Sequence, residues 1–271
     1  MSVHPASDAA FNLAQHVLRA GQAQPGKTAL EIVGPDGSDV WTYGTLTAAT
    51  RGIATGLARC GLRPGDRVLM RLGNTVEFPV AFLGAIASGL VPIPTSAQLS
   101  PREISRIAAE LDPALVIAAP GIARPDHPAP VLQACDLHGF HTLPPADWHR
   151  GDAERPAYIV LTSGTSGRMR AVVHAHRTIL ARRMMWEGWY GLRPEDRLLH
   201  AGAFNWTYTL GTGLMDPWSI GATALIPRAD TPSTDLPALL ARSGATIFAA
   251  APGIYRQMLR ENITPLPALR H

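Results

Sequence analysis

The chain has 271 residues, 46% of them hydrophobic and 17% charged, a composition typical of a globular protein and not of a disordered one. Its formal net charge is only +3 and its basic residues are scattered, so we expect no nucleic-acid partner. The single lysine is Lys27, so nearly every basic side chain is an arginine. The two cysteines, Cys60 and Cys135, lack the spacing of a disulfide framework or a zinc site. We expect both to be buried thiols in a reducing compartment.

The sequence predicts neither a secretion signal nor a membrane span. Residues 1–8 lack the basic-then-apolar order of a signal peptide. Residues 78–94 carry no charge, but they fall short of the about 20 apolar residues that a bilayer requires, and glycines and prolines interrupt them. We therefore expect a cytoplasmic protein.

The first half of the chain alternates predicted helices with short β-branched runs. Apolar residues recur at helical spacing over residues 46–60, and Gly61 follows where a helix-terminating glycine is expected. The sequence SPRE at residues 100–103 has the pattern of a capped helix start, with serine at the N-cap and glutamate at the third helical position. Further elements are expected as strands at residues 67–70, 91–93 and 115–118 and as a helix at residues 76–87. This rhythm predicts parallel strands joined by helical crossovers.

The second half resumes the alternation after a connector. Residues 124–155 are rich in proline, histidine, aspartate and glycine, and we expect at most a short strand there, at residues 131–132. The expected strands then lie at residues 158–161, 171–173, 197–199, 222–226 and 246–249, and the expected helices at residues 178–188, 210–218, 236–243 and 253–260. We predict an α/β fold with two mostly parallel sheets flanked by helices. A first subdomain with the connector spans residues 1–155, and a second, incomplete at its C-terminus, spans residues 156–271.

The segment TSGTSGRMR, from Thr162 to Arg170, follows a predicted hydrophobic strand and precedes a β-branched run. Its two glycines leave backbone N–H groups unshielded, and its hydroxyl and guanidinium groups can bind anions. Such a loop could bind a polyphosphate, although by composition alone a flexible surface turn is the more common meaning. It matches neither a Walker A loop nor a GxSxG nucleophile elbow.

This segment resembles the signature loop TSG[ST]TGxPKG of the adenylate-forming superfamily, which includes acyl- and aryl-CoA synthetases, luciferases and peptide-synthetase adenylation domains. Other parts of the chain resemble that superfamily in the same order: WTYGTL at 41–46, LGAIASGLVPIP at 83–94, HAHR at 174–177, FNWTY at 204–208 and APGIY at 251–255. The resemblance covers essentially the whole chain, which makes it far more specific than the loop alone. It implies the large N-terminal α/β domain of these enzymes.

The resemblance implies that the loop binds the β- and γ-phosphates of ATP. The implied ATP-binding residues are Thr162, Ser163, Gly164, Thr165, Ser166, Gly167 and Arg170. Among them, Thr162 and Arg170 are implied to take part in catalysis, and the hydroxyl of Thr165 to lie at Mg²⁺. Met169-Arg170 stands where the superfamily has Pro-Lys, so the positive charge is kept while the compact ammonium is lost.

The aromatic run at residues 204–208 stands where the superfamily has its acid pocket. The resemblance implies that Phe204, Asn205 and Trp206 line a substrate pocket, although alternating aromatic residues more often serve packing. His174 and His176 would share one face of an extended segment. Because no third ligand is in view, we expect ordinary packed or solvated histidines there and not a metal site.

Several later elements of the superfamily are not found in this sequence. It has no glutamate-bearing YGxTE element, no late TGD aspartate and no C-terminal catalytic lysine, because Lys27 is the only lysine. We therefore expect roughly the N-terminal half of such an enzyme, ending inside a domain.

The implied function is that of an AMP-forming acid–CoA ligase, with a small-molecule carboxylic acid, ATP and CoA as its substrates and Mg²⁺ as its metal. Two alternatives remain open. One is a non-catalytic or vestigial nucleotide-binding fragment, and the other is an acyl-AMP ligase that loads a carrier protein. No feature of the sequence selects the acid or an oligomeric state.

Overall fold

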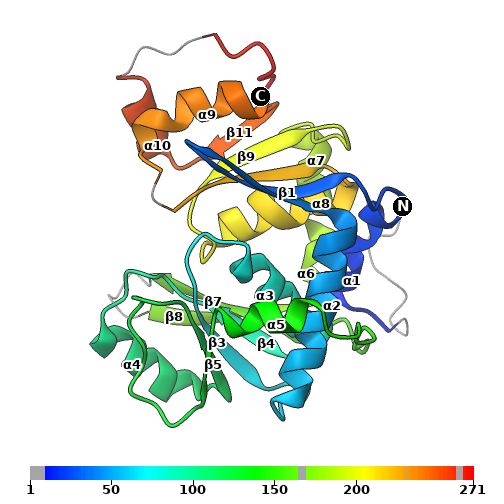
Figure 1. The fold of residues 1–271 in the computed structure, drawn as a ribbon, viewed down its shortest axis with the longest axis vertical. Helices are drawn as coiled ribbons and strands as arrows, with labels where there is room; N and C mark the ends of the chain where they lie inside the picture. Colours follow the sequence, from blue (N-terminus) through cyan, green and yellow to red (C-terminus); the bar gives the residue numbers. More distant parts are fainter. Residues whose placement is uncertain (1–9, 164–168, 230, 261–264) are drawn as a thin grey trace. The chain divides into compact units, whose positions relative to one another are not determined.

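The computed structural model describes residues 10–163, 169–229, 231–260 and 265–271, and its elements are labelled in Figure 1. The described residues form two compact units. The first takes residues from the ranges 1–16 and 47–180, and the second from 17–46 and 181–271. These units differ from the division at residue 155 that we expected from the sequence, because residues 156–180 belong to the first unit and residues 17–46 to the second.

A four-stranded, all-parallel sheet forms the centre of the first unit. Its order is β4-β3-β5-β6. The strands are β3 (Arg67–Arg71), β4 (Val91–Pro94), β5 (Leu115–Ala118) and β6 (Val131–Gln133), and the helices around them are α2 (Tyr43–Arg59), α3 (Glu77–Ala87), α4 (Pro101–Leu111) and α5 (Asp136–His141). Since α3 joins β3 to β4 and α4 joins β4 to β5, the predicted parallel strands with helical crossovers are confirmed.

The start of α4 has the predicted capping box. The Ser100 side chain accepts a hydrogen bond from the backbone N–H of Glu103, and the Glu103 carboxylate accepts one from the N–H of Ser100 at 2.9 Å. These two bonds satisfy N–H groups that a helix start otherwise leaves free. The buried face of the helix, which includes Ile104 and Ala108, then packs into the core that covers β3 and β5.

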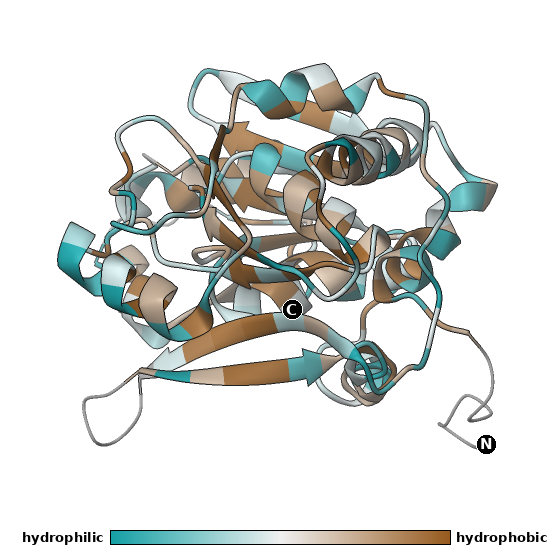
Figure 2. Cartoon of the chain, turned by 90° about the horizontal axis from the view of Figure 1, so that it is seen from below, coloured by the Kyte–Doolittle hydropathy of each residue, from teal (hydrophilic) through white to brown (hydrophobic). Residues whose placement is uncertain are grey.

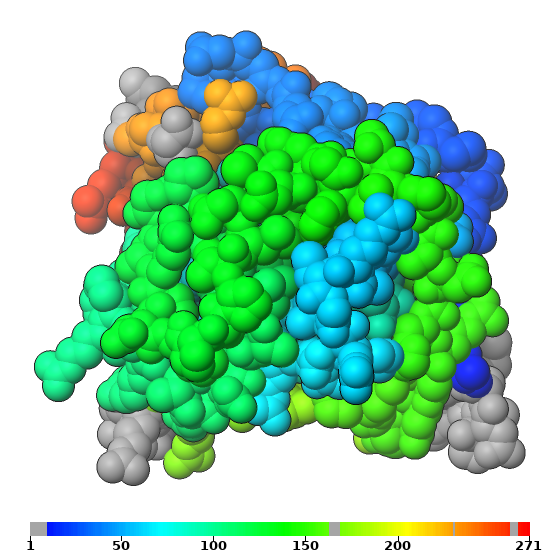
Figure 3. Space-filling model, turned by 60° about the horizontal axis from the view of Figure 1, so that its bottom comes forward, coloured from blue at the N-terminus to red at the C-terminus, as the bar shows by residue number. Residues whose placement is uncertain are grey.

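The connector after β5 lies across one face of the first unit (Figure 3) and is bonded to α2. Arg51 Nε donates to the carbonyl of Ala146 at 2.7 Å, and the Thr55 hydroxyl donates to the carbonyl of Pro144 at 2.6 Å. A Cβ at Gly56 would lie 2.2 Å from the ring of Phe140. A glycine is therefore required at this position of α2 for the connector to approach so closely.

Strands β7 (Pro156–Ser163) and β8 (Met169–Ala175) form a separate antiparallel hairpin in the first unit. Figure 2 shows apolar residues along the middle of both strands. Residues 157–160 of β7 are buried, and β7 packs beside β4, whereas residues 170–173 of β8 are exposed. The strand that enters the predicted loop is thus anchored in the core, and its partner lies outside it.

The second unit is built on a five-stranded sheet with the order β11-β9-β10-β1-β2. The strands are β1 (Thr28–Gly34), β2 (Gly37–Thr42), β9 (Arg197–Ala201), β10 (Thr223–Pro227) and β11 (Ile247–Ala250). All pairs are parallel except β1 with β2. Just before β1, the Lys27 ammonium donates to the carbonyls of Pro194 and Gly221, each at 2.6 Å.

Helices of the second half flank this sheet. They are α7 (Arg183–Gly188), the π-helix η2 (Thr209–Met215), α8 (Asp216–Ile220), η3 (Ser233–Asp235), α9 (Leu236–Ser243) and α10 (Pro252–Met258); the remaining helices are α1 (Leu13–Leu18), η1 (Arg19–Ala23) and α6 (Thr178–Ala181). Leu236, Leu239 and Leu240 of α9 pack on strand residues that include Leu199 and Phe248.

Several features differ from the expectations. Helix α5 lies within the connector, where at most a short strand was predicted, and residues 28–42 form a hairpin that was not predicted. The helix expected at residues 178–188 is divided at Arg182 into α6 and α7. The helix expected at residues 210–218 is instead a π-helix followed by α8.

The prediction that both cysteines are buried is wrong, because Cys60 and Cys135 are exposed. Both cysteines lie at helix ends. Cys60 follows the last residue of α2, and Cys135 precedes the first residue of α5. Among the described residues, no helix combines the length and the apolar character that crossing a membrane requires.

Candidate functional site

The β7–β8 hairpin carries the predicted phosphate loop. Five loop residues, 164–168, lie outside the described part of the chain, among them the predicted ATP-binding residues Gly164, Thr165, Ser166 and Gly167. Thr162 and Arg170 face each other at the end of the ladder, and the Thr162 hydroxyl donates to the Arg170 carbonyl at 3.5 Å. Next to them, the backbone of Ser163 pairs with that of Met169. The register thus brings the first and last residues of the predicted loop together on an exposed edge, while their roles toward ATP stay predictions.

Aromatic rings hold the hairpin nearer its base. The Tyr158 ring on β7 stacks on the His174 imidazole on β8, and the Phe82 ring of α3 meets the Tyr158 ring edge-on at 5.4 Å. Just past β8, His176 is fully buried, and its Nδ1 accepts a hydrogen bond from the Leu13 N–H at 3.0 Å. His174 and His176 therefore have packing and hydrogen-bonding roles in this unit.

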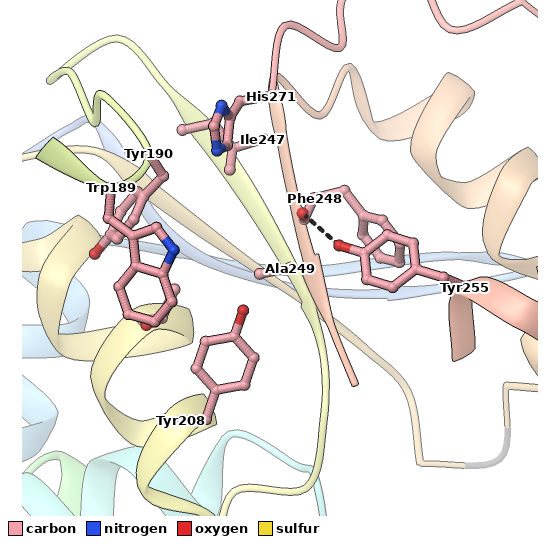
Figure 4. Close-up of a pocket in the computed structure, with 9 residues that line it drawn as sticks. Trp189, Tyr190, Tyr208, Ile247, Phe248, Ala249, Tyr255 and His271 are labelled. Atoms are coloured by element: carbon pink, nitrogen blue, oxygen red, sulfur yellow. Dashed lines mark hydrogen bonds between the residues drawn. The ribbon is translucent and has the colours of Figure 1, made fainter. Parts of the chain in front are cut away.

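A cavity of about 280 Å³ opens in the second unit (Figure 4). Five of its lining side chains are aromatic, and the full set is Trp189, Tyr190, Tyr208, Thr212, Ile247, Phe248, Ala249, Tyr255 and His271. In Figure 4, Trp189 and Tyr208 project from one side and Phe248 and Tyr255 from the other, with Ala249 between them. Trp189 is 58% exposed, so the cavity is open to solvent beside this ring. A space of this kind suits a flat, uncharged group.

The cavity walls come from separate elements. Tyr208 precedes the first turn of η2, Phe248 and Ala249 lie on β11, and Tyr255 lies on α10. The Tyr255 hydroxyl donates to the Phe248 carbonyl at 3.0 Å, which ties α10 to β11. Burial raises the pKa of the Tyr208 and Tyr255 phenols, so both stay neutral donors at physiological pH.

A buried ion pair lies behind one wall. Arg182 donates through Nε to Asp216 Oδ1 at 2.7 Å and through Nη2 to Oδ2 at 2.6 Å, and the Asp216 side chain is fully buried. Two lining residues bond to this pair: the Tyr190 hydroxyl donates to Asp216 Oδ2 at 2.5 Å, and the Thr212 hydroxyl accepts from Arg182 Nη2 at 3.1 Å. The bidentate geometry is the strong form of an arginine–carboxylate contact.

The residues predicted for the acid pocket do not line this cavity, although they are close in sequence to Tyr208, which does. Phe204 is buried, Asn205 is partly buried and Trp206 is 49% exposed. Tyr208, from the same aromatic run, does line the cavity. The assignment of Phe204, Asn205 and Trp206 to substrate binding therefore stays a prediction.

His200, at the carboxyl side of β9, was not singled out from the sequence. It is fully buried, its ring meets the Tyr208 ring edge-on at 4.6 Å, and neither ring nitrogen has a hydrogen-bond partner among the described residues. Burial lowers its pKa to about 4, so the imidazole is neutral at physiological pH. It therefore packs against the cavity wall as an uncharged ring.

The described ranges contain no group of three or more histidine, cysteine, aspartate or glutamate side chains placed to hold a metal ion. Mg²⁺ at nucleotide sites keeps several waters and is held largely by substrate phosphates. Thr165, the predicted protein contact of Mg²⁺, is one of the residues not described, so this assignment stays a prediction.

Comparison with known proteins identifies relatives of this chain. The family model described as "AMP-binding enzyme" matches residues 17–271. The 3-hydroxybenzoate–CoA/4-hydroxybenzoate–CoA ligase of Thauera aromatica is 28% identical over 260 residues, which cover 84% of this chain and 47% of that protein. The 4-hydroxybenzoate–CoA/benzoate–CoA ligase of Rhodopseudomonas palustris is 30% identical over 245 residues, covering 81% and 44%.

Solved structures agree in fold. A benzoate CoA ligase from Burkholderia xenovorans superposes with a TM-score of 0.81 at 27% identity, over 96% of this chain and 55% of that one. The chain thus spans about half the length of the relatives it matches.

Proposed function

The chain belongs to the AMP-binding enzyme family, and from that premise we propose that it serves the ATP-dependent activation of a carboxylic acid for transfer to CoA. The observation that carries the proposal is the family match over residues 17–271. The β7–β8 hairpin supports it, because its register sets Arg170 and Thr162 opposite each other at the mouth of the predicted phosphate loop.

The reaction has two steps. A carboxylate oxygen bonds to the α-phosphorus of ATP while the bond from that phosphorus to the bridging β-phosphate oxygen breaks, releasing pyrophosphate. The CoA thiol, losing its proton, then bonds to the acyl carbon, and AMP leaves. Mg²⁺ would neutralise charge on the departing phosphates. For this chain we propose that Arg170 and the loop amides bind the phosphates and that no side chain acts as a nucleophile.

We propose an aromatic acid as the substrate. Trp189, Phe248 and three tyrosines line the cavity of the second unit, and the neutral Tyr208 phenol can bond to a ring substituent. The names of the Thauera aromatica and Rhodopseudomonas palustris relatives, which specify benzoate or hydroxybenzoate, support the same class.

The test is acid-dependent exchange of labelled pyrophosphate into ATP, with benzoate and 4-hydroxybenzoate as the acids. It is run on the 271-residue chain and on any longer chain that the gene encodes beyond His271. Gly164→Val should abolish exchange because it obstructs the loop backbone, whereas Gly139→Val, where an added Cβ meets nothing within 4 Å, should not. ATP binding without exchange in any chain would contradict the proposal and favour the nucleotide-binding alternative. Exchange followed by transfer only to a carrier-protein thiol would favour the carrier-loading alternative.

A further inference from the structure

The ion pair of Arg182 and Asp216 does not line the cavity, but it is hydrogen-bonded to residues that do. Both groups that bond to it, Tyr190 and Thr212, are lining residues. They reach the cavity from different elements, since Tyr190 follows α7 and Thr212 lies in η2. The pair is thus a shared anchor of two wall residues that come from different segments of the chain.

The backbone of the π-helix η2 lies close to the Arg182 guanidinium at Gly211. A Cβ added at Gly211 would lie 2.2 Å from Arg182 Cζ, so the guanidinium lies directly against the helix backbone. Thr212 and Asp216 are four residues apart and both bond to the Arg182 side chain. Only a glycine at position 211 leaves room for an arginine to contact both.

The Asp216 carboxylate is fully buried and the Arg182 side chain is 22% exposed, so the ion pair holds a buried charge in a fixed geometry. An isolated buried charge is costly, so each partner holds the other in one place. The carboxylate also fixes the direction of the Tyr190 hydroxyl, which donates to Oδ2. The hydroxyl groups of Tyr190 and Thr212 are therefore bonded to the ion pair.

We infer that Arg182 and Asp216 are positioning residues that hold Tyr190 and Thr212 in the cavity wall and so determine which aromatic acids fit. The inference rests on the proposed function for the identity of the ligand class. It adds that selectivity is set by a buried ion pair that does not touch the acid.

The test measures binding of benzoate and of the larger 2-naphthoate to the full chain by calorimetry, without ATP. The main variant replaces both charges together, Arg182→Met with Asp216→Leu, because apolar replacement of a whole buried pair is often tolerated. The matched control is Arg197→Met with Glu31→Leu, which removes another ion pair of the same unit, 2.5 Å long, whose residues neither line the cavity nor bond through their side chains to a residue that does. A second variant, Tyr190→Phe, keeps the ring and removes its bond to Asp216.

We expect the Arg182/Asp216 variant to unfold cooperatively, which shows that it is folded. It should bind benzoate about tenfold more weakly and lose its preference for benzoate over 2-naphthoate, because the cavity wall is no longer preorganised. The control should keep both the affinity and the preference. Equal losses in the control, an unchanged preference in the Arg182/Asp216 variant, or no benzoate binding by the parent chain would overturn the inference. If the double variant does not fold, an unchanged preference in Tyr190→Phe would overturn it, and a reduced preference would support it. Because the assay contains no ATP, binding with no pyrophosphate exchange contradicts only the proposed function.

Discussion

The phenol ring of Tyr158 lies flat on the imidazole of His174, with ring centroids 4.5 Å apart and planes within 5°. The two residues also face each other in the β7–β8 ladder, four positions before Thr162 pairs with Arg170. The stack therefore fixes the register that carries the predicted phosphate loop.

His174→Ala should lower the free energy of unfolding by about 1 kcal/mol, the usual value of an aromatic pair beyond its buried area. It should also weaken ATP binding, because the hairpin register becomes less well defined. Urea denaturation and calorimetry measure the two effects. Val172→Ala, two residues away on the same strand and 41% exposed, is the control. Indistinguishable effects of the two substitutions would show that the stack does not fix the hairpin.

His176 should make the stability of the chain fall on acidification. Burial, followed by the nearby positive charges of Arg155 and His149, lowers its pKa from 6.5 to about 3. Above pH 6.5 both the folded and the unfolded states hold it neutral. Between pH 6.5 and about 3 only the unfolded state takes up the proton, so up to about 1.4 kcal/mol of stability is lost per pH unit.

His176→Gln removes this titration while the amide oxygen can still accept from the Leu13 N–H. Denaturation curves at several pH values from 7 to 4 should give a shallower slope for this variant than for the parent chain. The slope should not vanish, because His200 is also buried with a lowered pKa. Parallel slopes would exclude His176 as a source of the acid sensitivity.

Arg170 should contribute to ATP binding mainly through its charge. Arg170→Ala should weaken ATP binding by about tenfold or more, the range of a charge-assisted hydrogen bond, whereas Arg170→Lys should retain most of the affinity. The difference should shrink as salt is added. Arg183→Ala removes the same charge at an exposed position of α7 and serves as the control. Equal affinities for the alanine and lysine variants would argue against a role for the charge.

Gly211→Ala should destabilise the chain strongly. The new methyl group would overlap the Arg182 guanidinium and separate it from Asp216, leaving a buried carboxylate without its partner. Because the contacting atoms are the flexible end of a side chain that is 22% exposed, we expect a loss of about 1–3 kcal/mol, the usual cost of inserting a methyl group into a packed site. Gly253→Ala in α10, where an added Cβ meets nothing within 4 Å, should change stability by about 1 kcal/mol or less. A small effect at Gly211, measured by urea denaturation, would mean that Arg182 can relocate without cost.

Local signals predicted much of the fold. The capping box at Ser100 and the β-branched runs depend on neighbours within a few residues, and the helix at residues 236–243 has the predicted bounds. Helix α5 lacked such a signal, since its six residues include two histidines and a glycine. The π-helix was expected as an ordinary helix because its wider hydrogen-bond pattern has no residue signature of its own.

The cavity could not be predicted in the same way. Its walls come from residues far apart in the chain, from Trp189 to His271, and no short motif links them. The pairing of Arg182 with Asp216 joins residues 34 positions apart, and each alone looks like an ordinary helix-end charge. The phosphate loop, by contrast, could be predicted because its residues are contiguous in sequence, and its role stays a prediction.

Because Lys27 is the only lysine, the chain has a single cleavage site for a lysine-specific protease. A lysine-specific protease can cut it at a single peptide bond, Lys27–Thr28, where the side chain is bonded to two carbonyls and the next residue begins β1. Cleavage requires the start of β1, an interior strand of the sheet, to separate from its neighbours. The rate of appearance of the two fragments therefore reports how often this part of the second unit opens, and a bound aromatic acid should slow it.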